Sequence, residues 1–505
     1  MTAPAPGGGR SIAILAGPVA ATALLLFGDL APDRPEIDRT AAVALWMAIW
    51  WITEAVPLAV TSLLPVVLLP ALGVMNGKDV ASEYFNHIVF LFLGGFIVAL
   101  AIERWGLHRR IALRTLLLFG ARPARILLGF MVTTALLSMW ISNTATAMMM
   151  VTIVLAVVKK IEEGAPGERA RRYVAGLLIG VAWAASIGGI ATLVGTPPNL
   201  SFARIFERTF PDAPMIDFAS WMAFALPITL VMLAIGWVVL TLAFVPRGGG
   251  LSIDRDHLEE EAISLGAMSR EERAILVAFG ALVGLWLFRA DIDLGAFVIP
   301  GWSNLLSVPG YVNDGSVAVA VALALFVLPT RRAPSGRLMD WETAQKIPWH
   351  IILLFGGGFA LATAFAHSGL SDWLGERLKD GAPSSPLLLV GVLCIGVTFL
   401  TELTSNIATT EMLLPVVAGL ARALEMNPLA LMVPVTMSCS CAFMMPVATP
   451  PNAIVFGSER IRIAEMARVG VVMNLIGAVV ITAVALALGP LVLGIDADVF
   501  PDWAK

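Results

Sequence analysis

Charged side chains and cysteines are both scarce in this chain. Of its 505 residues only 14% are Asp, Glu, Lys or Arg, and three are Cys, whereas a typical soluble domain is roughly 25% charged. Three Cys in apolar runs exclude a disulfide framework, and they lack the neighbouring His or Cys pair of a zinc site. Hydrophobic residues make up 58% of the chain, and the mean hydropathy is +0.85. A soluble core cannot bury such an excess, so we predict an all-α polytopic membrane protein.

Apolar segments long enough to cross a bilayer recur along the chain. A spanning helix needs about 20 mainly apolar residues. Two segments, 127–158 and 384–424, are too long for one span, and each carries a polar Ser-Asn pair in its middle. We predict a re-entrant hairpin for each of these. The other eleven segments are predicted to span the membrane: 11–30, 41–56, 57–74, 88–103, 174–200, 218–245, 273–289, 315–330, 349–366, 428–456 and 469–494.

Basic residues flank the first hairpin on both sides, at 104–125 and 159–172. Cytoplasmic loops carry an excess of Lys and Arg, and a hairpin that enters and leaves on the cytoplasmic side satisfies both basic stretches. The N-terminus is then cytoplasmic and the C-terminus outside, in a multi-pass protein of the inner (plasma) membrane. The remaining loops predicted inside are 246–273, 331–348 and 458–468.

The strongest pattern is an internal repeat. LFLGGFIVALAIERWG at 91–106 is similar to LFGGGFALATAFAHSG at 354–369, and SNTAT at 142–146 is similar to SNIAT at 405–409. GTPPN at 195–199 returns as ATPPN at 448–452. In the predicted topology, the segments that open the two repeats run in opposite directions across the bilayer. The repeats are therefore inverted, as in many secondary transporters.

The repeated motifs predict a binding site near the middle of the membrane. Each repeat offers a hairpin tip and a helix broken by a Pro-Pro pair, and non-helical backbone is tolerated at that depth only inside protein or beside a cavity. Helix N-termini there attract an anion, while freed carbonyls and Ser, Thr or Asn oxygens suit sodium. No Lys, Arg or His lies in these motifs, so co-bound sodium is expected to neutralise the anion. The predicted sodium ligands are Ser138, Ser142, Asn143 and Gly195 in one repeat and Thr401, Ser405, Asn406 and Ala448 in the other.

Carboxylates in apolar segments are functional candidates by default. Glu402 and Glu411 flank the second Ser-Asn pair. For Glu402 we favour a structural role, in which it accepts hydrogen bonds that hold the hairpin leg, over proton carriage or cation binding. A carboxylate that faced the substrate would repel an anion.

Three other classes of protein fit the motifs less well. A sodium/proton antiporter or arsenite-type permease is expected to place Asp or Glu at the tips, where this chain has Ser and Asn. An intramembrane enzyme needs a nucleophile–base pair or a metal cluster, yet the five His are scattered. A channel suits broken helices in inverted repeats less well than alternating access does. We therefore predict no enzyme activity, no organic cofactor and no nucleic-acid partner.

The motifs resemble those of the divalent anion:sodium symporter family. The resemblance runs from about residue 41 to 494 and includes WWITEAVPLAVTSLLP at 50–65, SNTATAMM at 142–149 and TELTSNIATTEMLLPV at 401–416. It implies a homodimer in which a transport domain moves past a scaffold as an elevator. The implied substrates are C4-dicarboxylates such as succinate, malate or fumarate, with citrate or sulfate as alternatives; sodium-independent exchange stays open. The implied substrate contacts are Ser142, Asn143, Thr144, Thr196, Pro197, Ser405, Asn406, Thr449 and Pro450.

The same resemblance divides the chain into parts, and one position departs from its pattern. Position 407 is Ile where the first repeat has Thr144, so a hydroxyl is missing beside the predicted substrate. The parts are scaffold helices with the N-terminal segment at 1–103, an interfacial helix at 104–126, the first repeat of the transport domain at 127–245, a cytoplasmic loop with scaffold helices at 246–366, an interfacial segment at 367–383 and the second repeat of the transport domain at 384–505.

Overall fold

The computed structural model describes residues 8–120, 122–164, 167–246, 256–293, 297–497 and 499–505. These residues are mostly helical, and one short antiparallel ladder pairs β1 (Ile292–Asp293) with β2 (Val298–Ile299). Residues 1–7 of the predicted cytoplasmic N-terminus and residues 247–255 of the loop predicted at 246–273 lie outside the described residues.

One of the spans predicted near the N-terminus is wrong. The segment 57–74, predicted as one span, forms two short helices separated at Ser62 and Leu63. Pro65 has no amide hydrogen for the carbonyl one turn earlier, so the helix is interrupted there. The hydroxyl of Tyr84 donates to the carbonyl of Ser62 at the interruption. The helices of this region are α1 (Gly8–Phe27), α2 (Pro35–Thr53), α3 (Leu58–Thr61), α4 (Leu64–Ala71) and α5 (Gly77–Tyr84).

Two sets of helices then follow in the same order, as the internal repeat predicts. In each set a long helix ends at a glycine with positive φ, Gly106 at 71° and Gly369 at 78°, from which a short helix departs. The first set is α6 (His87–Arg104), α7 (Leu107–Leu117), α8 (Pro123–Ser138), α9 (Asn143–Gly164), α10 (Glu168–Ile190), α11 (Pro197–Thr209) and α12 (Phe218–Phe244). The second is α17 (Trp349–Ser368), α18 (Leu370–Lys379), α19 (Pro386–Leu400), α20 (Asn406–Ala423), α21 (Pro428–Cys439), α22 (Pro450–Phe456) and α23 (Ile463–Val492).

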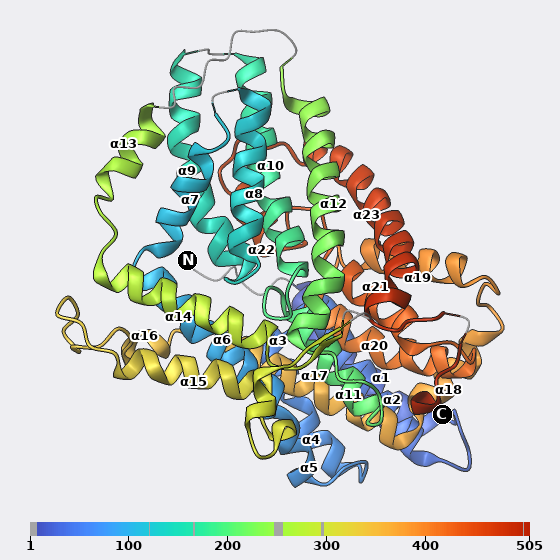
Figure 1. Cartoon of the computed structure of the whole chain (residues 1–505). Helices are drawn as coiled ribbons and strands as arrows, with labels where there is room; N and C mark the ends of the chain where they lie inside the picture. Colours follow the sequence, from blue (N-terminus) through green and yellow to red (C-terminus); the bar gives the residue numbers. More distant parts are fainter. Residues whose placement is uncertain (1–7, 121, 165–166, 247–255, 294–296, 498) are drawn as a thin grey trace.

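The segment between the sets adds two further helices, α14 and α15, that pack beside α6. In Figure 1, α14 and α15 cross the middle of the molecule together with α6, while α8, α9, α10 and α12 rise above them. The elements outside the two sets are α13 (Asp256–Ser264), α14 (Arg270–Leu287), η1 (Trp302–Leu305), η2 (Pro309–Tyr311), α15 (Asp314–Val327), α16 (Trp341–Ala344) and, after the second set, η3 (Asp502–Ala504).

The first legs of the two predicted hairpins are shorter than a membrane span. The first legs, α8 and α19, have 16 and 15 residues, and at 1.5 Å per residue each falls short of a hydrocarbon core about 30 Å thick. Among the described residues, five helical segments are long and apolar enough to cross a membrane: 77–104, 168–190, 218–244, 349–368 and 463–492. The count of eleven spans stays a prediction.

The two sets of helices interlock. From the first set, α11 packs against α20 and α21 of the second, and α22 of the second packs against α9 and α10 of the first. α12 and α23 also lie against each other. Each hairpin's second leg therefore touches the broken helix of the opposite set, which gathers all four motifs in one region.

The close approach of α18 to α20 gives a test of the packing. A Cβ added at Gly419 would overlap the backbone carbonyl of Ser371, so we expect Gly419→Ala to force the helices apart and destabilise the protein by roughly 1–3 kcal/mol. Gly396→Ala is the control, because nothing lies within 4 Å of the added methyl. Thermal unfolding in detergent is the measurement, and equal midpoints for the two variants would contradict the packing.

Candidate functional site

The first hairpin tip is held by its own hydroxyl and amide groups. The hydroxyl of Ser142 accepts a hydrogen bond from the amide of Ala145 at 3.2 Å, which caps the start of α9. Ser138, the last residue of α8, is fully buried. Its hydroxyl donates to the carbonyl of Ala185 in α10 at 2.7 Å and lies 2.6 Å from Oδ1 of Asn143. The tip is thus bonded to the helix that leads into the first Pro-Pro motif.

Several oxygen atoms converge on Asn143. Besides the hydroxyl of Ser138, the carbonyl oxygens of Ala185 and Gly195 lie 3.1 and 3.2 Å from the atom that occupies its Oδ1 position. Carbonyl oxygens only accept hydrogen bonds. Such a set suits either an amide turned so that its NH2 group faces them or a hard cation between the oxygens. Three of the four predicted sodium ligands of this repeat, Ser138, Asn143 and Gly195, therefore meet at one place.

The second hairpin tip has the same arrangement. The hydroxyl of Thr401 is fully buried and lies 2.7 Å from Oδ1 of Asn406 and 2.9 Å from the carbonyl of Cys439 in α21. Thr401 corresponds to Ser138 and Asn406 to Asn143 in the sequence repeat. In both tips a hydroxyl thus links an Asn five residues later to a carbonyl of the helix before the break.

The breaks themselves are held by two asparagines that the sequence reasoning missed. The amide of Asn199 donates to the carbonyl of Thr192 at 2.7 Å and to two more carbonyls at the end of α10. Asn452 donates to the carbonyls of Ala442 and Met445 at 3.1 and 3.0 Å. Both side chains are fully buried. The available signal was the third residue of each Pro-Pro-Asn motif, which satisfies carbonyls that the interrupted helix leaves without partners.

Glu402 has the structural role that we favoured. Its side chain is buried, and its two oxygens accept hydrogen bonds from the backbone amides of Met444 and Met445 at 2.8 Å. The amide of Asn474 in α23 donates to it at 2.8 Å as well. The carboxylate therefore holds the unwound stretch between α21 and α22 against the hairpin and the last helix.

The other predicted site residues lie at the starts of helices. Thr449 caps α22, and its hydroxyl accepts a hydrogen bond from the amide of Asn452 at 3.3 Å. Thr196 and Ser405 precede α11 and α20, and Thr144 lies in the first turn of α9. Within the described residues the hydroxyls of these last three make no hydrogen bond, so they are free for a ligand. The remaining positions are Pro197 and Pro450, which begin α11 and α22, and Ala448, which is buried next to Thr449.

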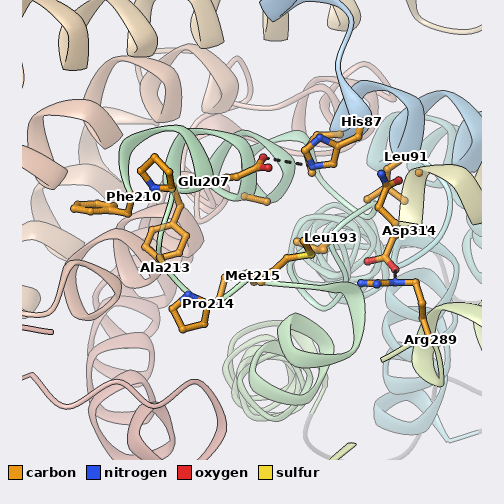
Figure 2. A pocket seen from close by; sticks show the side chains of 17 residues that line it. His87, Leu91, Leu193, Glu207, Phe210, Ala213, Pro214, Met215, Arg289 and Asp314 are labelled. Atoms are coloured by element: carbon orange, nitrogen blue, oxygen red, sulfur yellow. Dashed lines mark hydrogen bonds and ion pairs between the residues drawn. The ribbon is translucent and has the colours of Figure 1, made fainter. Parts of the chain in front are cut away.

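A cavity of about 130 Å³ lies apart from the hairpin tips. Figure 2 shows His87 facing Glu207 across it, with Arg289 paired to Asp314 at one side. The Nε2 atom of His87 is 3.4 Å from Oε2 of Glu207. None of the predicted substrate or sodium ligands lines this cavity, so we do not assign the transport site to it.

The chain is similar in sequence to known sodium-coupled transport proteins. The family model described as "Sodium:sulfate symporter transmembrane region" matches residues 30–495. The sodium-dependent dicarboxylate transporter SdcS of Staphylococcus saprophyticus is 42% identical over 496 residues, covering 97% of this chain and 93% of its own. SdcS of Staphylococcus aureus strain RF122 is also 42% identical, over 501 residues, with the same shares of the two chains covered.

Two solved structures share the fold at low sequence identity. The YdaH transporter of Alcanivorax borkumensis aligns with a TM-score of 0.54 and 15% identity over 82% of this chain and 90% of its own. MtrF of Neisseria gonorrhoeae, an antimetabolite efflux pump, aligns with a TM-score of 0.52 and 14% identity over 83% of this chain and 84% of its own. At these identities the likeness concerns the fold alone.

The role of the missed asparagines is testable. Asn452→Ala leaves two buried carbonyls without their donor, and we expect a loss of about 1–3 kcal/mol of stability, seen as a lower thermal midpoint in detergent. Asn304→Ala removes only an exposed hydrogen bond, from the Asn304 amide to Asp291 at 2.6 Å, and should lower the midpoint much less. A midpoint for Asn452→Ala that matched that of the control would refute the role given to this amide.

Proposed function

The chain belongs to the sodium:sulfate symporter family, and from this membership we propose that it carries a C4-dicarboxylate across the membrane together with sodium ions. It is a membrane transport protein and not an enzyme. Relatives that are 42% identical over almost the whole chain are sodium-dependent dicarboxylate transporters, and this supports a dicarboxylate over sulfate.

The observation that carries the proposal is the pair of matched oxygen sets at the hairpin tips. Sodium is a hard cation, and transporters bind it with carbonyls of unwound helices and nearby polar side chains. In the first tip these oxygens come from Ser138, Asn143 and Gly195, with Ser142 beside them. In the second they come from Thr401 and Asn406, and we propose that Ser405 and Ala448 complete this set. The carbonyls of Ala185 and Cys439 extend the two sets.

The substrate is proposed to bind between the two tips. Helices α9 and α20 begin at Asn143 and Asn406, and the positive N-terminal ends of their dipoles favour the two carboxylates of the substrate. The free hydroxyls of Thr144, Thr196 and Ser405 supply donors, as do Ser142 and Thr449. With no cationic side chain in the motifs, sodium must be present before the dianion binds stably. This order of binding couples the substrate to the sodium gradient.

Transport is proposed to proceed as an elevator in a homodimer. The transport domain comprises 127–245 and 384–505, whose elements interlock, and the inverted repeats supply the two access routes. Glu83 of α5, in the scaffold, is fully buried and pairs with Arg204 at 2.9 Å and Arg208 at 2.7 Å. Both arginines lie on α11 of the transport domain. Such pairs hold one position of the transport domain and have to separate when it slides.

Uptake into proteoliposomes tests the function. We expect radiolabelled succinate to accumulate when an inward sodium gradient is imposed, and not with potassium. Asn143→Ala and Asn406→Ala should each abolish uptake in folded protein, and Met149→Leu is the control. Uptake that requires dicarboxylate inside the vesicles would instead indicate an exchanger, and full activity in either Asn variant would overturn the site.

The sodium ligands are separable from the substrate ligands. Thr401→Ala removes one oxygen from the second set, and we expect the sodium concentration for half-maximal uptake to rise about tenfold, which equals roughly 1.4 kcal/mol. Thr398→Ala, one turn earlier, is a matched control, because Thr398 is buried and its hydroxyl has no partner among the described residues. An equal rise in both variants would mean that general loosening of α19, and not loss of a ligand, is responsible.

A further inference from the structure

An open groove runs between α14 and α15, and none of the predicted substrate or sodium ligands lines it. Its volume is about 700 Å³, which lies in the range of roughly 300–1,000 Å³ typical of ligand pockets. Alanines line much of the groove, and their methyl groups fill little of the space between the helices. The lining residues are Ala274, Val277, Ala278 and Ala281 of α14 and Ala320, Val321, Ala324 and Leu328 of the α15 side.

Two arginines stand at one end of this groove. Arg270 and Arg273 occupy the first turn of α14 and are exposed. In the part of the chain that the structure describes, neither guanidinium group has a hydrogen-bond or ion-pair partner. An apolar groove with a cationic end matches a ligand that is itself apolar with an anionic end.

The acidic residues of the same turn do not neutralise these arginines, because they are already paired. Glu271 accepts a hydrogen bond from Thr330 at 2.7 Å and lies 3.6 Å from Arg332. Glu272 pairs with the buried Arg110 at 2.7 Å. The two positive charges at the groove are therefore left over after the local ion pairs are made.

The stability of α14 does not explain the two arginines either. Positive charges near a helix N-terminus are unfavourable, since the helix dipole is positive there. Ser269 and Glu272 already cap this end with a capping box. An anion bound at Arg270 and Arg273 would meet both the guanidinium groups and the positive end of the dipole.

We propose that the groove between α14 and α15 binds one anionic phospholipid. Its phosphate contacts Arg270 and Arg273, for which guanidinium is suited by its paired donors, and an acyl chain lies along the alanines. Val277 and Leu323 near the groove are 66% and 59% exposed, as lipid-facing residues are. The arginines lie at the end of α14 that follows the loop predicted to be cytoplasmic, where anionic lipids recruit basic residues. The inference depends on the chain being a membrane protein and not on its substrate.

Native mass spectrometry of the full chain in detergent tests the site. Phosphatidylglycerol and phosphatidylcholine with identical acyl chains are the probes, and we expect tighter binding of phosphatidylglycerol. Arg270→Gln with Arg273→Gln should weaken that binding about tenfold or more. The matched control replaces Arg114 and Arg125, which are also exposed and lie in the basic stretch predicted on the same membrane face.

A second variant separates the groove from general surface charge. Ala278→Trp fills the groove without altering charge and should reduce the binding of both lipids, while the thermal midpoint confirms that the protein is folded. Equal affinity for the two lipids, or an equal loss in the control pair, would overturn the proposal. One more outcome would overturn the proposal. If Ala278→Trp left lipid binding unchanged but dissociated the oligomer, the groove would be covered by a second copy of the chain and not by lipid.

Discussion

The structure depends on how it satisfies interrupted backbone where no water is available. A helix that stops inside a membrane protein leaves amides and carbonyls without partners, and each one left unsatisfied in that environment is costly. Here side chains replace the missing turns. Asn199 and Asn452 bind the carbonyls, Glu402 binds the amides, and the indole of Trp221 donates to the carbonyl of Ile190 at the end of α10. The motif residues are free to face a ligand only because these groups hold the backbone around them.

Much of this arrangement is readable in the sequence. The length of the two polar-centred segments and the repeated Pro-Pro-Asn motifs predict the breaks, and the helices begin at Asn143, Pro197, Asn406 and Pro450. A proline at the first position of a helix needs no amide partner, so the pattern has a local physical cause. The roles of the Ala185 and Cys439 carbonyls were not predictable, because every residue type has a backbone carbonyl and the sequence does not show which of them take part in a site. They reach the tips only through packing between helices distant in the chain. The break at Pro65 was missed for a different reason: the segment is apolar enough overall to read as one span, although Thr61, Ser62 and Pro65 stand at the interruption.

The two repeats are matched but not equivalent. Six residues separate α10 from α11, whereas ten separate α21 from α22. The longer stretch exposes the extra amides of Met444 and Met445, and these are the ones that Glu402 binds. The first repeat has Met139 at the position of Glu402. In its shorter break, the hydroxyl of Thr192 donates a hydrogen bond to the carbonyl of Met139. The carboxylate thus occurs only in the repeat with the longer unwound stretch, where it binds the amides of that stretch.

The interlocking of the two sets also constrains how the chain is made. α11 ends at residue 209, and the helix α20 that packs against it begins at residue 406. At a synthesis rate of about 5–20 residues per second, roughly 10 to 40 s pass before α20 emerges. During that time Ser201, whose partner Glu411 lies on α20, resides in an incomplete protein. The first half therefore stays partly assembled in the membrane, with the face of α11 that later packs on α20 uncovered, until the second half is made.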